Sequence, residues 1–126
     1  SEEDMQKAIL IQPSLVETGL KLITYEKKVE PGFIDAYGLD ENGRMAVIEI
    51  KRKTAGKEAA LQLAKYVESV KKSTDREVRG ILVAPGLAKG VQKILATFQM
   101  DFKQLDPKNC AEVLRSSETK RLLEFM

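Results

Sequence analysis

Apolar and polar residues follow two periodicities along this chain, one helical and one of strands, and together they predict a mixed α/β domain. Apolar residues recur at helical spacing over 1–12, 57–72, 88–99 and 109–126, the last as one or two helices. A further short helix is expected between Pro13 and Gly19. Alternating or wholly apolar runs predict strands over 20–25, 33–39, 45–51, 79–85 and 101–105.

The order of these elements predicts a mixed β-sheet flanked by α-helices. The turn sequence Asp40-Glu41-Asn42-Gly43 joins the second and third strands into a β-hairpin. The apolar run over 79–85 is typical of a buried parallel strand. A chain of 126 residues suffices for one hydrophobic core, so we expect one domain over 1–115 and a tail or helix over 116–126.

The composition excludes several kinds of chemistry. The chain has no histidine and a single cysteine, Cys110, which excludes Ser-His-Asp and Cys-His catalysis and the usual zinc sites. Carboxylates, lysine and tyrosine remain, and carboxylate oxygens favour Mg²⁺ or Mn²⁺. No apolar run approaches the roughly 20 residues of a membrane span, and the acidic first residues do not form a signal peptide. We therefore expect no membrane partner and a cytoplasmic location.

Positive charge is concentrated in the middle of the chain. The net charge of +2 is too small to indicate nucleic acid, but residues 51–79 carry nine lysines and arginines against four acids. A basic segment of this kind can face a phosphate backbone. A solvated helix with surplus lysines explains the same charge, and on charge alone it is the simpler interpretation.

The candidate active site consists of Asp35 and the segment Glu49-Ile50-Lys51. An acid followed two residues later by lysine occurs five times, but only this instance lies inside a strand that otherwise resembles core. The strand period of two places Glu49 and Lys51 on one face. Burying two ionisable groups costs several kcal/mol unless they are paired or bind an ion.

The hairpin returns the strand of Asp35 beside Glu49. Two carboxylates brought together repel each other, and a divalent cation relieves the repulsion. Lys51 is then placed to orient or deprotonate a water and to balance charge on a phosphate. A buried ion network without activity is the structural alternative, and the spacing alone does not decide between the two.

Asp35 followed by Glu49-x-Lys51 across a hairpin resembles the PD-(D/E)XK nuclease signature. Gln62 and Tyr66 match the Q-x-x-x-Y motif of RecB-like nucleases, and they lie one helical turn apart on a face offset from the apolar stripe. The wider likeness includes Gly32-Phe33-Ile34-Asp35, residues 40–43, 47–52, 59–68 and 79–85. In these segments the chain resembles the carboxy-terminal nuclease domain of the NucS/EndoMS family, endonucleases that act on branched or mismatched DNA.

The resemblance implies a restriction-endonuclease-like fold and a Mg²⁺-dependent (or Mn²⁺-dependent) DNA endonuclease. The reaction would be hydrolysis of phosphodiester bonds in branched, flapped or mismatched DNA during repair. By the same resemblance, Asp35, Glu49 and the backbone carbonyl of Ile50 bind the metal, and Lys51 serves the water and the transition state. Gln62 and Tyr66 position the site or the DNA backbone.

Further residues are assigned as flanking contacts. Arg52 and Lys53 resemble the basic residues that follow the motif in the family, and with Lys57 and Lys65 they are expected to contact DNA. Glu17 is a candidate for the additional helical carboxylate of related nucleases, although an exposed surface glutamate is the simpler interpretation.

The family also implies partners beyond DNA. The full-length protein is expected to form a homodimer through an amino-terminal domain. The tail resembles sliding-clamp-binding peptides, with Leu122, Phe125 and Met126 as anchors and Thr119 in place of the usual glutamine, so the clamp PCNA is a candidate partner. The alternative is a terminal helix that docks its apolar face on the domain.

Two other functions stay open from the sequence. One is a Holliday-junction or restriction-type nuclease of the same fold. The other is a catalytically inert DNA-binding module.

Overall fold

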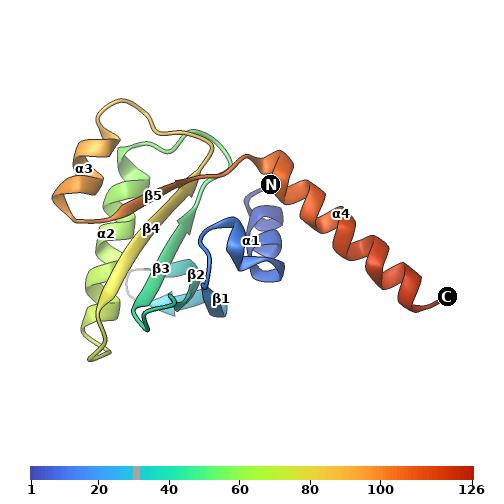
Figure 1. Cartoon of the computed structure of the whole chain (residues 1–126). Helices are drawn as coiled ribbons and strands as arrows, with labels where there is room; N and C mark the ends of the chain where they lie inside the picture. Colours follow the sequence, from blue (N-terminus) through green and yellow to red (C-terminus); the bar gives the residue numbers. More distant parts are fainter. Residues whose placement is uncertain (30–31) are drawn as a thin grey trace.

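A five-stranded mixed sheet lies at the centre of the fold, in the order β1-β2-β3-β4-β5 (Figure 1). The computed structural model describes residues 1–29 and 32–126. The strands are β1 (Lys21–Val29), β2 (Gly32–Leu39), β3 (Met45–Ile50), β4 (Val78–Ala84) and β5 (Asp101–Gln104). The first three pair antiparallel, and β3, β4 and β5 pair parallel. The predicted mixed sheet is therefore confirmed.

The helices are α1 (Glu2–Ile11), the 3₁₀ turn η1 (Pro13–Leu15), α2 (Lys57–Lys71), α3 (Val91–Thr97) and α4 (Pro107–Glu124). Helix α1 begins with a capping box, in which the Ser1 hydroxyl accepts from the backbone N–H of Asp4 at 3.2 Å. No helix in the described residues is long and apolar enough to cross a membrane.

Each face of the sheet is covered by helices, so the molecule has two cores (Figure 1). Helices α2 and α3 cover one face, where Val47 and Leu82 pack with Leu63 and Leu95. Helix α1 and the start of α4 cover the other face. There the core contains Met5, Ile9, Ala46, Ile48, Ile50, Ile81, Val83 and Cys110. The expectation that Ala46, Ile48 and Ile50 share one face of their strand is confirmed.

One glycine sets how closely α2 approaches the sheet. A Cβ atom added at Gly80 on β4 would lie 2.9 Å from Cγ2 of Val67 and 3.2 Å from Cγ of Leu63. Real Cβ atoms do not tolerate the first distance. The bare backbone of β4 therefore lets the apolar stripe of α2 pack tightly on the sheet.

Some element boundaries differ from those predicted from the sequence. Strand β1 continues past Tyr25 to Val29, and β3 ends at Ile50, so that Lys51 begins a loop. The expected helix after Pro13 is reduced to η1, and α3 is shorter at both ends than the predicted 88–99. Gly90, with a left-handed φ of 88°, precedes the first turn of α3 and delays its start.

Helix α4 is continuous across the expected boundary at residues 115 and 116 and projects from the body of the molecule (Figure 1). Its first half packs beside α1 through Cys110, Val113 and Leu114. Its end is uncovered: Leu122, Phe125 and Met126 are 64%, 87% and 98% exposed. In this structure these three side chains are therefore not covered by the domain.

Candidate active site

The Asp35 carboxylate lies where β2 and β3 separate. The paired register of these strands runs from Leu39↔Met45 to Ala36↔Ile48 and ends there. Beyond it, Oδ2 of Asp35 accepts a hydrogen bond from the backbone N–H of Ile50 at 2.8 Å. The side chain thus replaces the strand backbone as the partner of this buried amide.

Helix α1 holds the second oxygen of the same carboxylate. The Gln6 side-chain amide donates from Nε2 to Oδ1 of Asp35 at 3.1 Å, and Gln6 is only 8% exposed. The sequence analysis missed Gln6. A signal was present, because Gln6 is a polar residue among the buried Met5, Ala8 and Ile9 of the α1 stripe.

Glu49 on β3 is buried next to Asp35. Burial, a hydrogen bond between the two carboxyl groups and the charge of Asp35 together raise the pKa of Glu49 to about 9, and the nearby Lys51 ammonium opposes this rise. At neutral pH without metal, the carboxyl pair therefore retains a proton. Asp35 and Glu49 are brought together by the hairpin, as expected from the sequence.

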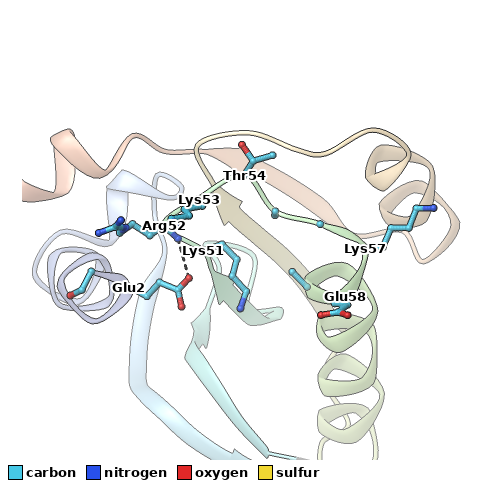
Figure 2. A pocket seen from close by; sticks show the side chains of 11 residues that line it. Glu2, Lys51, Arg52, Lys53, Thr54, Lys57 and Glu58 are labelled. Carbon is cyan, nitrogen blue, oxygen red and sulfur yellow. Dashed lines mark hydrogen bonds between the residues drawn. The ribbon is translucent and has the colours of Figure 1, made fainter.

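Lys51 follows directly after β3 and remains attached to the sheet. Its backbone N–H donates to the carbonyl of Val83 at 2.8 Å, which extends the ladder between β3 and β4 by one bond. The half-buried side chain points into the space between α1 and α2 (Figure 2). The lysine thus approaches the carboxyl pair from the loop side, and its charge acts on Glu49.

Tyr66 connects α2 to this site. Its hydroxyl accepts a hydrogen bond from Nε2 of Gln62 at 2.7 Å and another from the backbone N–H of Phe33. Burial, with the nearby charges of Glu49 and Asp35, raises the pKa of Tyr66. The expected pair of Gln62 and Tyr66 therefore exists. The Tyr66 ring belongs to the core while its hydroxyl faces the site.

A pocket of about 790 Å³ opens beside Lys51 (Figure 2). It is lined by residues 51–59 together with Ser1 and Glu2. The Glu2 carboxylate accepts from the backbone N–H of Arg52 at 3.2 Å, and its charge contributes to the raised pKa of Glu49. Glu2 is thus a second α1 residue at the site that the sequence analysis missed. Its place in the first turn resembled an ordinary helix-start acid.

Glu17 does not lie at the site, contrary to the expectation that it could add a carboxylate. Its carboxylate pairs with Nη1 of Arg79 at 2.8 Å, and Arg79 also pairs with Asp40 at 3.3 Å and Asp101 at 2.7 Å. Arg79 stands opposite Ala46, three residues before Glu49 on β3 and thus roughly 10 Å away. Glu17 therefore takes part in an ion-pair network around Arg79 at the end of the sheet away from Glu49.

The four basic residues expected to contact DNA do not form one surface. Arg52 and Lys53 line the pocket. Lys57 lies at its edge but turns away from Lys51 toward α3 (Figure 2). Lys65 lines a separate groove with Leu61, Glu68 and Phe98. Lys65 directly precedes Tyr66, and one residue rotates a helix by roughly 100°, so the two side chains leave α2 on different sides.

The donor set is compatible with one hard divalent cation. In the described part of the chain, no three acidic or cysteine side chains gather as a metal cluster. Asp35 and Glu49 instead form a pair that shares a hydrogen bond. Mg²⁺ is commonly held by one or two carboxylates and completed by water, so this pair suits it.

A mixed sheet between helices, with an acid pair and a lysine at the β2–β3 edge, defines a restriction-endonuclease-like domain of the PD-(D/E)XK type. The family model of the endonuclease NucS C-terminal domain matches residues 1–123. Endonuclease NucS of Pyrococcus horikoshii is 38% identical over 122 residues, which are 97% of this chain and 48% of that protein. Endonuclease NucS of Methanopyrus kandleri is 41% identical over 107 residues, 85% of this chain and 41% of that protein. The chain belongs to the NucS C-terminal domain family.

Solved structures agree with this assignment. An EndoMS–dsDNA complex superposes with a TM-score of 0.81 at 36% identity and covers 85% of this chain and 45% of that one. A repair endonuclease from Pyrococcus abyssi has a TM-score of 0.81 at 39% identity, with 85% and 47% covered. The chain spans about half the length of the curated relatives it matches.

Two substitutions at Asp35 are expected to differ in stability when EDTA removes divalent ions. Asp35→Asn keeps an oxygen for the Ile50 amide and removes the neighbouring charge that disfavours ionised Glu49, so it should melt no lower than the wild type. Asp35→Ala leaves the Ile50 amide and Gln6 without their acceptor, and should lose about 1–3 kcal/mol of unfolding free energy. Chemical denaturation measures both. A loss of several kcal/mol in Asp35→Asn would support the inactive ion network instead.

The unfolding free energy of the metal-free protein should fall as pH rises from about 5 to 9. The Glu49 pKa is about 9 in the fold, against an ordinary value of 4.5, so the folded state holds the extra proton in this range. The chain has no histidine to titrate there. Urea unfolding at several pH values in EDTA should show that Glu49→Gln flattens the fall. Glu112→Gln, at an exposed position on α4, is the control and should retain it.

Proposed function

We propose that this chain is the catalytic domain of a Mg²⁺-dependent DNA endonuclease that hydrolyses phosphodiester bonds in branched, flapped or mismatched DNA. The observation that carries the proposal is the pair formed by the buried Glu49 and the half-buried Asp35 where β2 and β3 separate, with Lys51 beside it. The names of its relatives, an endonuclease and a repair endonuclease, support the same activity.

Asp35, Glu49 and the backbone carbonyl of Ile50 would hold the cation, Mg²⁺ or Mn²⁺. When bound, the cation supplies Lewis-acid polarisation of the phosphate and a more acidic water. The metal would also take the place of the proton that the carboxyl pair now shares, so it would relieve the cost of burying Glu49 next to Asp35.

The side chains around the pair have separable tasks in this proposal. The Lys51 ammonium points into the space beside the carboxyl pair, where it can orient or deprotonate the attacking water and balance charge on the phosphate. Gln62 and Tyr66 fix the β2 backbone next to Asp35 and present polar groups to the DNA. Gln6 holds Asp35 in position through its amide.

Arg52 and Lys53 are proposed as contacts to the DNA backbone at the rim of the pocket. The position of Lys57 supports such a contact less well, and the position of Lys65 does not support it.

We propose that the part of the relatives this chain does not span supplies the choice of DNA structure and the homodimer contact. A Holliday-junction or restriction-type nuclease remains the alternative within the fold. The inert module is disfavoured because Glu49 would then be buried beside the half-buried Asp35 and Lys51 without a task.

Three alanine variants should separate the roles in catalysis. Asp35→Ala and Glu49→Ala should abolish both divalent-ion binding and cleavage, whereas Lys51→Ala should still bind the ion and cleave at least roughly 100-fold more slowly. Cleavage of mismatched, flapped and four-way DNA with Mg²⁺, alongside calorimetric titration of the ion, measures both properties. Cleavage by Asp35→Ala at the wild-type rate would refute the site.

DNA binding by this chain should be weak, independent of sequence and sensitive to salt. Arg52 and Lys53 are exposed at the pocket rim, and displaced counterions give such contacts their salt dependence. The variant Arg52→Glu/Lys53→Glu should bind more weakly than Lys120→Glu, an exposed lysine of α4 away from the pocket. Fluorescence anisotropy from low to moderate salt measures this. An affinity that does not change with salt would contradict the proposal.

We further propose that the end of the chain binds a sliding clamp, because Leu122 in the last turn of α4 and Phe125 and Met126 just after it are mostly exposed. Such a segment can insert its apolar side chains into a pocket of the partner. Calorimetry of a peptide of residues 116–126 against the host's clamp should give modest affinity, and the double variant Leu122→Ala/Phe125→Ala should give none. No heat from the wild-type peptide would exclude the clamp.

A further inference from the structure

Phe33 presents a large aromatic side chain to solvent next to the candidate active site. It is 59% exposed, although the following residue, Ile34, is fully buried. Phe33 precedes Asp35 by two residues on β2, so the two lie roughly 6.6 Å apart along the strand. A ring that is mostly exposed gains only part of its possible burial energy in the fold, so a further benefit is sought in what it contacts.

The backbone that carries this ring is fixed to α2. The N–H of Phe33 donates to the Tyr66 hydroxyl, which also accepts from Gln62. The chain approaches Tyr66 so closely at Gly32 that an added Cβ would lie 2.9 Å from the hydroxyl oxygen. The backbone of Phe33 is therefore held close to the carboxyl pair while most of its side chain is exposed.

We propose that Phe33 is a nucleobase-binding residue whose ring stacks on an unpaired base next to the scissile phosphate. This inference rests on the proposed nuclease function. A ring two residues from a metal-binding acid is within the reach of a nucleotide neighbouring the one that is cut. Every base has an aromatic face, so stacking would not require a particular sequence.

Stacking on Phe33 would also make this domain selective for particular DNA structures. A paired base inside a duplex has both faces covered by its neighbours, so the ring can stack on it only after it leaves the helix. Bases at a flap, a branch or a mismatch leave the stack at lower cost. Phe33 would then favour DNA with a displaced base beside the cut.

The test measures binding to flapped and mismatched DNA in which single nucleotides around the cleavage site are replaced, one at a time, by abasic sites. The proteins are the wild type, Phe33→Ala and Phe33→Trp. Phe98→Ala is the matched control, because Phe98 is 49% exposed and lies in the groove beside α2 rather than at the site. Melting temperatures confirm that each variant folds.

The wild type should lose roughly 5- to 150-fold in affinity when one particular base is removed, the range expected for one stacked base. Phe33→Ala should show the same loss on intact DNA and no further loss at that abasic site. Phe33→Trp should retain the wild-type pattern, and Phe98→Ala should behave as the wild type.

Two results would overturn the inference: Phe33→Ala binding intact DNA as tightly as the wild type, or Phe33→Ala remaining as sensitive to the abasic site as the wild type. Cleavage of the intact DNA by the wild type with Mg²⁺ is measured in parallel. Absence of cleavage counts against the proposed function, whereas normal cleavage with an unaffected Phe33→Ala counts against the stacking role alone.

Discussion

The hydrogen bond from the Ile50 backbone amide to the Asp35 carboxylate is the contact on which the site depends. It ends the pairing of β2 with β3 without leaving a buried amide unsatisfied. The two neighbours of Asp35 on β2 belong to different cores: Ile34 packs in the core beneath α2, whereas Ala36 packs in the core beneath α1.

The two helices next to the sheet reach this point from opposite sides. From α1, Gln6 holds Asp35, and Glu2 accepts from the amide of Arg52 just beyond Lys51. From α2, Tyr66 holds the backbone of Phe33. Each of the two hydrophobic cores thus fixes one side of the carboxyl pair. The site is consequently supported from both cores by ordered strands and helices, the kind of support that preserves the geometry of a functional site.

Only contacts between residues close in the sequence, within one hairpin or one helix, could be predicted from the sequence. Strand period and a strong turn at residues 40–43 sufficed to bring Asp35 beside Glu49, and the helical spacing of Gln62 and Tyr66 put both on one face of α2. Contacts between distant elements could not be predicted this way. Gln6 lies 29 residues from Asp35, and Glu17 meets Arg79 across 62 residues. The spacing of residues within one helix or strand does not tell which side chain of another element they will contact.

The carboxyl pair without metal is energetically unfavourable, and other parts of the fold must stabilise it. Burial and the neighbouring Asp35 favour the protonated form of Glu49, so folding places Glu49 where its anion is disfavoured. The arrangement persists because strands and helices on both faces hold the backbone of residues 35 and 49 by apolar packing that does not involve the carboxyl groups. A cation entering this site would therefore find its ligands already in place. Binding of the cation would require the displacement of a proton but no further ordering of the chain.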